Sequence, residues 1–278
     1  MTTSWQQRSV GLLIALAALF GCEQNPVTGR SQLMIVSEEQ AQAASVQAYA
    51  KTVADAQTKR RLDTNAARTA RVRAITNRLV AQAKTVSPVT AGWAWELHVI
   101  DDPSVNAWCM PGGKMAVYTG LIDRLAPSDD ELAQVIGHEI SHALLQHGRE
   151  RMSRAVATNV ALQVGSIAAG VDLTGLETVA MVALELPNSR GAELEADKLG
   201  IELTAKAGYD PQAAVTLWQK MSQLSAGART PQWLSTHPSD EARIAQLRAL
   251  VPQMMPYYQA ARGGETPRAA KPRERGRD

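Results

Sequence analysis

A single predicted helix constrains this chain more than any other feature. It begins at the capping box Ser128-Asp129-Asp130-Glu131 and is expected to run to about His147 and Gly148, with an apolar stripe that must be buried. The motif His138-Glu139-Ile140-Ser141-His142 lies inside it. Residues four apart share one helical face, so both imidazoles can reach one metal ion. Zn²⁺ is the ion expected there, with Glu139 placed to take a proton from water.

Zinc in a catalytic site needs a third protein ligand, and the sequence offers two candidates. The metzincin pattern is excluded, because Leu145 and Gly148 stand where it requires glycine and histidine. His147 is expected to lie toward the end of the helix, away from the metal. Glu193 is the better candidate, because Asp197 shares its helical face and can accept a hydrogen bond from a ligating histidine. Alone, this pair is a common helix-surface pattern, and it gains weight only from the upstream motif.

The remaining segments predict an α+β domain that is predominantly helical. Alanine is abundant and aromatic residues make up only 4% of the chain, which favours helices over an all-β sandwich. Further helices are expected from the capping box at 37–40, over about 72–86, from Ser189 to near Gly208, from Asp210, and from Ser239 to Pro252. Strands are expected over Trp93–Ile100 and Lys114–Tyr118.

Residues 155–171 carry no charged side chain. Asn159, Gln163 and several glycine and serine residues interrupt the apolar pattern, which argues against a membrane span. Helices that are buried or cover the active site are the favoured interpretation of this segment.

Both ends of the chain are expected to lie outside the folded domain, which spans residues 37–261. Residues 1–21 have one basic side chain and an apolar run that is too short to cross a bilayer, as is typical of a secretion signal. Leu19-Phe20-Gly21-Cys22 resembles the bacterial lipobox, so Cys22 is expected to carry lipid. Phe20 departs from that pattern, and an ordinary cleaved signal is the alternative. Residues 22–36 are expected to form a turn-rich tether, and the basic residues 262–278 a disordered tail.

The charge and the cysteine content exclude further classes of protein. The formal net charge is +2, and residues 22–261 alone carry 22 basic and 24 acidic side chains, so no nucleic-acid partner is expected. Cys22 and Cys109 are the only cysteines. If Cys22 is acylated, no intrachain disulfide can form, and Cys109 is expected to be a small buried residue.

Taken together, the motifs resemble the membrane-associated zinc endopeptidases that include HtpX, the CAAX prenyl proteases and the mitochondrial Oma-type proteases. The periplasmic lipoprotein members such as LoiP and YcaL are the most similar. The resemblance covers about residues 25–262. It rests on Asn25-Pro26-Val27-Thr28-Gly29, Asn106-Ala107-Trp108, Pro111-Gly112-Gly113, the motif at 138–142, residues 190–200, and Thr236-His237-Pro238 with Arg243. It implies a zincin-like fold with one Zn²⁺ per chain, held by His138, His142 and Glu193, and Glu139 as the base.

The same resemblance implies two further parts of the site. A substrate strand would lie along the edge strand of a small sheet, at Asn106, Ala107, Pro111, Gly112 and Gly113. His237 and Arg243 would reach the active site and stabilise the oxyanion. The alternatives are a packing histidine and a solvated helix arginine. The transmembrane helices of the integral-membrane members are not found, so a role with prenylated substrates is not carried over.

The predicted function is a zinc endopeptidase that cleaves misfolded or unassembled exported proteins. It would face the periplasm of a bacterial envelope, anchored by lipid in the outer rather than the inner membrane. The alternative is a chaperone or assembly lipoprotein whose zinc site is closed or structural. A closed set of four ligands indicates structure and an open one catalysis, so the position of His237 discriminates. Glu139 favours the enzyme, because a structural site has no use for a base beside the metal.

Overall fold

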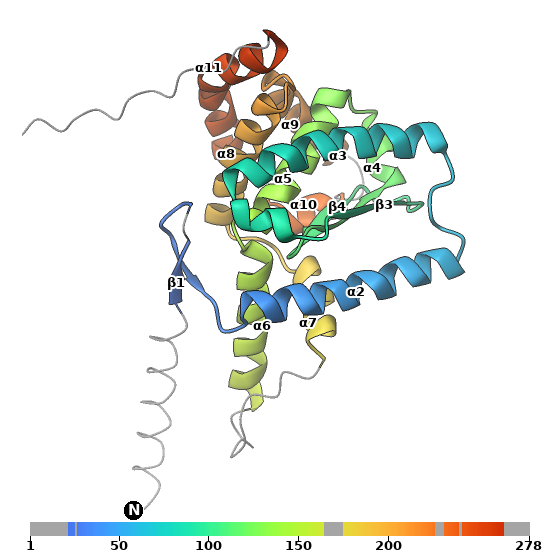
Figure 1. Ribbon diagram of the computed structural model, residues 1–278, viewed down its shortest axis with the longest axis vertical. Helices are drawn as coiled ribbons and strands as arrows, with labels where there is room; N and C mark the ends of the chain where they lie inside the picture. The colour runs from blue at the N-terminus through green and yellow to red at the C-terminus, as the bar shows by residue number, and fades with distance from the viewer. Residues whose placement is uncertain (1–21, 26, 164–174, 226–230, 239–240, 264–278) are drawn as a thin grey trace, which may run out of the picture.

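The computed structural model describes residues 22–25, 27–163, 175–225, 231–238 and 241–263 (Figure 1). The expected signal at 1–21, most of the expected tail, the cap at Ser239 and residues 164–171 of the uncharged segment lie outside the described residues. Among the described residues, no helix is both long enough and apolar enough to cross a membrane. The predicted α+β class, predominantly helical with a small sheet, is confirmed.

A three-stranded sheet lies between two groups of helices (Figure 1). Strand β3 (Glu96–Ile100) runs parallel to β5 (Lys114–Tyr118), and β4 (Ala107–Met110) pairs antiparallel with the other side of β5. The order β3-β5-β4 therefore makes β4 an edge strand. Side chains alternate between the two faces, so Val117 joins one apolar cluster and its neighbour Ala116 joins the other.

Each face of the sheet is covered by its own helices. The larger group contains α3 (Ala66–Val86), α5 (Asp129–Leu144), α8 (Arg190–Lys206), α9 (Gln212–Ser225) and α11 (Glu241–Gly263). The smaller group contains α2 (Glu38–Thr58), α6 (His147–Gln163) and α7 (Leu176–Glu185). Three short helical elements lie between the longer elements along the chain: η1 (Pro88–Gly92), α4 (Thr119–Leu125) and α10 (Gln232–Thr236). Cys109 is buried in the larger cluster, as predicted.

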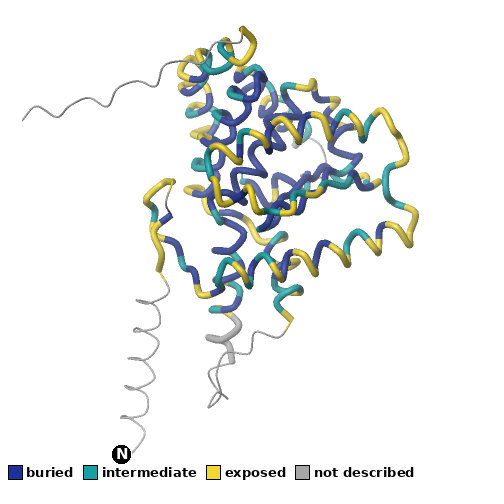
Figure 2. The backbone as a smooth tube through the Cα atoms, in the orientation of Figure 1, coloured by how far each residue is buried: buried dark blue, intermediate teal, exposed yellow. Residues whose placement is uncertain are grey.

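Helix α5 is the centre of the molecule, and Figure 2 shows it as a continuous buried segment. The predicted capping box is present: the Ser128 hydroxyl accepts from the Glu131 amide at 3.1 Å, and the Glu131 carboxylate accepts from the Ser128 amide at 2.9 Å. The helix ends at Leu144, earlier than predicted. Gln146 has a φ of 58°, which turns the chain so that His147 begins α6.

Helix α8 packs closely against α5 because glycine residues meet at their crossing. A Cβ atom added to Gly200 of α8 would lie 3.1 Å from the backbone nitrogen of His138. A Cβ added to Gly137 of α5 would lie 2.7 Å from the Thr204 side chain. This close approach of the two backbones lets a side chain of α8 reach the histidines of α5.

The last helix was expected to end at Pro252, and that expectation is wrong. Helix α11 continues to Gly263 through Pro252 and Pro256. Both prolines are exposed on the solvent side of the helix. Beyond Pro252, Met254 is buried in the core and Lys206 lies over the Tyr257 ring, so tertiary packing outweighs the unfavourable proline positions.

Residues 22–36, expected to be a tether, contain a docked hairpin. Strands β1 (Cys22–Gln24) and β2 (Ser31–Leu33) pair antiparallel around the turn at Asn25. The Asn25 amide donates to the Leu145 carbonyl oxygen at 2.9 Å, and Gln32 donates to the same oxygen at 3.0 Å. Composition alone suggests an irregular linker here. The buried amides show why the segment is ordered, because each one needs a partner on the folded domain.

Candidate metal centre

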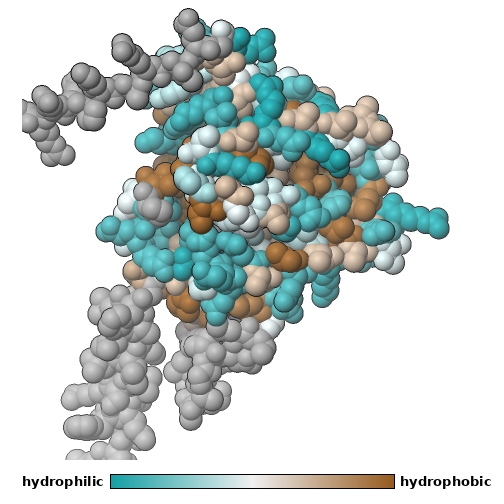
Figure 3. Space-filling view, viewed as in Figure 1, coloured by the Kyte–Doolittle hydropathy of each residue, from teal (hydrophilic) through white to brown (hydrophobic). Residues whose placement is uncertain are grey.

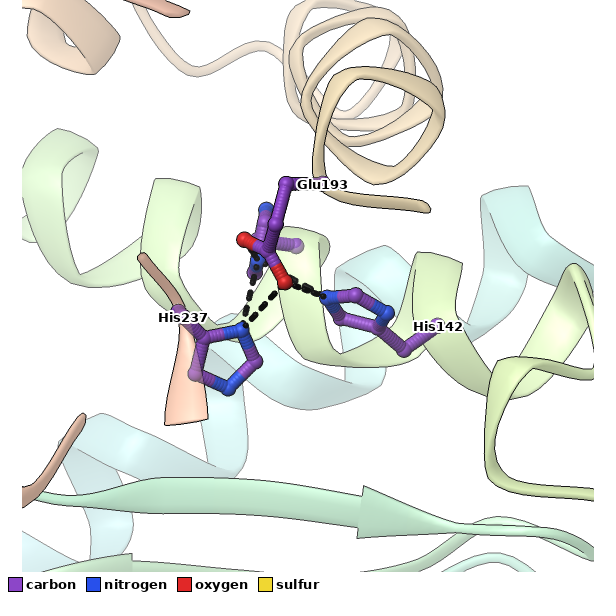
Figure 4. A group of neighbouring side chains, drawn as sticks. His142, Glu193 and His237 are labelled. Atoms are coloured by element: carbon purple, nitrogen blue, oxygen red, sulfur yellow. Dashed lines mark hydrogen bonds and ion pairs between the residues drawn. The ribbon is translucent and has the colours of Figure 1, made fainter. Parts of the chain in front are cut away.

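Four buried side chains converge at one point in the helical layer (Figure 4). His138 and His142 come from α5, Glu193 from the first turn of α8, and His237 from the residue that follows α10. One nitrogen or oxygen from each lies within 4.8 Å of all the others. The Nε2 atoms of His138 and His142 are 3.0 Å apart, and each lies 3.3 Å from a Glu193 oxygen.

His237 supplies a fourth atom to this group. Its Nδ1 lies 3.2 Å from His138 Nε2 and 3.0 Å from Glu193 Oε1. Four atoms that surround one centre tetrahedrally at about 2.0–2.1 Å lie roughly 3.3 Å from one another. The contacts of 3.0–3.3 Å, in which His138 meets one Glu193 oxygen and His142 and His237 meet the other, are close to the spacing of a tetrahedral zinc site. Three imidazole nitrogens and one carboxylate oxygen are also donors that zinc prefers.

Electrostatics support the same conclusion. Burial would raise the pKa of Glu193, but the neighbouring histidines hold it well below its usual range, so the carboxylate is ionised. Burial lowers the pKa of His142 well below normal, which leaves a neutral imidazole. Although Glu193 Oε2 lies 2.6 Å from Arg243 Nη1, no described donor meets it in hydrogen-bonding geometry. A buried carboxylate beside the neutral imidazole of His142 is suited to a cation at the centre of the group.

The outer nitrogen of His138 is held by Asp197, in the contact that the sequence predicted. His138 Nδ1 lies 3.0 Å from Asp197 Oδ1. Burial would lower the pKa of His138, but its hydrogen bonds to Asp197 and Glu193 raise that pKa to about 9. Arg243 donates to both Asp197 oxygens at 2.7 Å and is itself buried. Arg243 is therefore neither a solvated arginine nor a free donor, since its guanidinium is engaged by two carboxylates.

The outer nitrogen of His142 is held by a residue whose contact the sequence analysis missed. His142 Nδ1 lies 2.8 Å from His147 Nδ1, and His147 Nε2 lies 3.0 Å from Glu195. His147 was expected to lie toward the end of the motif helix, away from the metal. The turn at Gln146 changes the direction of the chain and places His147 beside the metal-ligand histidine His142. A third histidine, five residues after the last histidine of the motif, was the available signal.

Glu139 lies beside the metal-ligand group and is positioned by Trp233. The Trp233 indole Nε1 donates to Glu139 Oε1 at 2.7 Å, and the same oxygen lies 3.4 Å from His237 Nε2. The Trp233 ring stacks on the His237 ring with centroids 4.9 Å apart. A buried indole N–H needs a hydrogen-bond acceptor, but no pattern in the sequence predicts that Glu139 is the acceptor for Trp233.

A narrow cleft connects Glu139 to the edge strand β4. It is bounded by β4, α5, α6 and α7, and is lined by Asn106, Ala107, Trp108, Cys109, Glu139, Arg151, Leu184, Glu185, Thr236 and His237. Two of the expected substrate-binding residues, Asn106 and Ala107, thus share a cleft with the expected base. The Pro111–Gly113 turn lies at the far end of β4, against Gln42, Trp95 and Gly148.

Sequence comparison connects this geometry to a known group of proteins. The family described as peptidase family M48 matches residues 66–251, which include the sheet, the three motif residues of α5 and Glu193. The chain belongs to peptidase family M48. As in M48 metallopeptidases generally, the metal that suits this four-residue group is zinc.

Curated relatives of this M48 chain share moderate identity with it. The mitochondrial metalloendopeptidase OMA1 of Arabidopsis thaliana is 38% identical over 175 residues, which is 62% of this chain and 35% of that protein. The mitochondrial metalloendopeptidase OMA1 of Bos taurus is 31% identical over 261 residues, or 89% and 49%. The beta-barrel assembly-enhancing protease of Escherichia coli is 30% identical over 190 residues, or 64% and 38%. The chain thus spans half or less of the length of these relatives.

Proposed function

We propose that this chain is a zinc endopeptidase that cleaves misfolded or unassembled proteins in a bacterial envelope. The observation that carries the proposal is Glu139, a buried carboxylate beside the metal-ligand group that lines the cleft along β4. The relatives named as metalloendopeptidases and as a beta-barrel assembly-enhancing protease support both the reaction and the substrate class.

The metal, Glu139 and strand β4 would each have a separate role in peptide hydrolysis. Bound zinc supplies Lewis acidity, which polarises a peptide carbonyl and makes water a better nucleophile. Glu139, held by the Trp233 indole, takes the proton of the attacking water and returns it to the leaving amine. The edge strand β4 offers backbone groups to an extended substrate, starting at Asn106 and Ala107.

The position of Arg243 favours a holding role over direct contact with the oxyanion. Its guanidinium lies 2.6 Å from Glu193 and donates twice to Asp197, so the donors that reach the site are already used within it. We propose that Arg243 holds two carboxylates in place: Glu193, which is the metal ligand, and Asp197, which contacts His138.

The proposed location is the periplasmic side of the outer membrane, with lipid attached at Cys22. Two features support it: the lipobox-like residues 19–22 and the exposed position of Cys22 at the start of β1. Figure 3 shows a predominantly hydrophilic described surface on one face, with apolar patches between the polar ones. Radiolabelled palmitate incorporation into the full chain, compared with Cys22→Ser, would test the anchor directly.

The decisive test of the proposed function is cleavage of an unfolded protein by the purified full chain. Unfolded casein should be cut at internal bonds, cleavage should stop on removal of zinc with a chelator, and stoichiometric zinc should restore it. Fragments can be identified by mass spectrometry. A preparation that holds zinc yet leaves casein, and other unfolded envelope proteins, intact would instead support the chaperone alternative.

His237 occupies the fourth position around the metal-ligand group, and we propose that it closes the site at rest. This closed set of four side chains is the observation that favours the alternative function, a chaperone or assembly protein with a structural zinc site. The role of His237 therefore needs a test of its own. His237→Ala is expected to raise basal cleavage of unfolded casein, because the fourth position becomes permanently available to water. The measurement is the initial rate at equal zinc content.

The opposite result would assign His237 a different role. A loss of roughly 10²–10³-fold would mean that His237 stabilises the oxyanion, since that is the usual cost of removing one such donor. A rate within about twofold of the wild-type rate would indicate that His237 only packs against Trp233. Asn188→Ala is a useful comparison, because its side chain contacts His237 Nδ1 at 3.3 Å without reaching Glu139.

A further inference from the structure

The N-terminal hairpin is connected to a metal-ligand histidine by an unbroken series of polar contacts. Arg30, in the segment between β1 and β2, contacts both oxygens of Glu195 through Nε, at 3.1 and 3.0 Å. Glu195 then contacts His147 at 3.0 Å, and His147 contacts His142 at 2.8 Å. The series joins four residues from three separate parts of the chain.

The donors and acceptors in this series can be ordered from one end to the other. A carboxylate only accepts, so His147 Nε2 carries the hydrogen that faces Glu195. His147 Nδ1 is then the acceptor of a neutral ring, and His142 Nδ1 must donate to it. A histidine with hydrogen on Nδ1 has its lone pair on Nε2. That is the atom of His142 that faces Glu193 and the other ligands.

The two motif histidines are therefore held by equivalent but separate supports. His138 is held by Asp197, which is held in turn by Arg243 of α11. His142 is held by His147 and Glu195, which are held by Arg30 of the hairpin. In each case an arginine fixes a carboxylate that orients an imidazole. Only the second support depends on a residue outside the span matched by the family.

The hairpin is built to hold Arg30 in one place. Its two terminal nitrogens, Nη1 and Nη2, donate to the two oxygens of Glu150 of α6, at 3.1 and 2.7 Å. Gln32 also donates to Glu150 at 3.0 Å, and it contacts the Leu145 carbonyl that follows α5. Glu150 and Gln32 are buried, so this docking is fixed on both sides. The arginine therefore has little freedom to leave Glu195.

We propose that the N-terminal hairpin completes the metal centre, with Arg30, Glu195 and His147 acting as positioning residues that fix the tautomer and orientation of His142. This inference rests on the proposed zinc site, but it concerns metal affinity rather than proteolysis. Loss of partners that orient a metal-ligating histidine typically weakens metal binding by about 10–100-fold. Displacement of residues 22–36 from the domain would therefore loosen zinc without touching a ligand.

The test compares zinc affinity among variants of the full chain. Arg30→Gln and His147→Leu each interrupt the series and are expected to weaken zinc binding by about 10–100-fold. His147→Gln should restore most of the affinity, because an amide can accept from His142 with its oxygen and donate to Glu195 with its nitrogen. The measurement is competition with a chromophoric chelator at fixed pH. The visible spectrum of the cobalt-substituted protein reports on ligand geometry independently.

Glu23→Gln is the matched control for the hairpin itself. Glu23 accepts from Arg149 at 3.0 and 2.9 Å, so this change removes another ion pair that docks the hairpin but has no link to His142. Its zinc affinity and cobalt spectrum should match those of the wild type. The thermal midpoint of each metal-free variant separates a local effect from general unfolding.

Two results would overturn the inference. One is wild-type affinity, within about threefold, and an unchanged cobalt spectrum in Arg30→Gln. The other is an equal loss in Glu23→Gln, which would show that docking alone matters and the series of contacts does not. Arg30 is partly exposed, with 26% of its side chain accessible, so Arg30→Gln remains interpretable if His147→Leu fails to fold. None of these readouts depends on casein cleavage, so failure of the proposed function would be recognised separately.

Discussion

Glu139→Gln is expected to lose peptide hydrolysis almost completely while it retains its zinc. Loss of proton transfer alone costs about 10²–10⁴-fold, and the negative charge near the metal disappears with it. The substituted amide keeps the size of the side chain, and its oxygen can still accept from Trp233. The measurements are the initial rate of casein cleavage and the zinc content of the same preparation.

Two comparisons make the Glu139 result specific. Glu202→Gln removes the same charge from an outward position on α8, where the carboxylate pairs with Lys206, and should cleave at the wild-type rate. Trp233→Phe removes the donor to Glu139 and should lower the rate less than Glu139→Gln does. Near-normal cleavage by Glu139→Gln would mean that another residue is the base.

Much of the metal centre could be predicted from the sequence because its main elements are local. Spacings of four residues place His138 with His142 and Glu193 with Asp197, whatever the rest of the fold does. The capping box at Ser128 is local in the same way, and the structure contains it. These predictions depend only on helical geometry within a few turns.

The remaining features depend on contacts between distant segments. Trp233 meets Glu139 across 94 residues, and Arg30 meets Glu195 across 165 residues, and no spacing rule relates such pairs. The turn at Gln146 is local, but its positive φ on a residue other than glycine is unusual, so the early end of α5 was missed. The hairpin was read as a tether because its order depends on buried partners such as Leu145 and Glu150.

Glu193→Ala is expected to lose most of its zinc, although three histidines would remain. The reason is the charge that Glu193 balances. Arg243 Nη1 lies 2.6 Å from Glu193 Oε2 and is buried, so removal of the carboxylate leaves a guanidinium facing the metal position without that anion. A buried cation beside Zn²⁺ is strongly unfavourable, and Asp197 can balance only part of it.

The zinc content of dialysed protein measures this effect, from about one ion per chain in the wild type to a small fraction in Glu193→Ala. Glu193→Gln keeps the size of the side chain but not its charge, and should also lose zinc if charge balance is decisive. Glu202→Ala, on the same helix, is the control and should bind zinc normally. Full occupancy in Glu193→Ala would remove Glu193 from the ligand set. Retention by Glu193→Gln alone would show that the ligand atom matters more than the charge it brings.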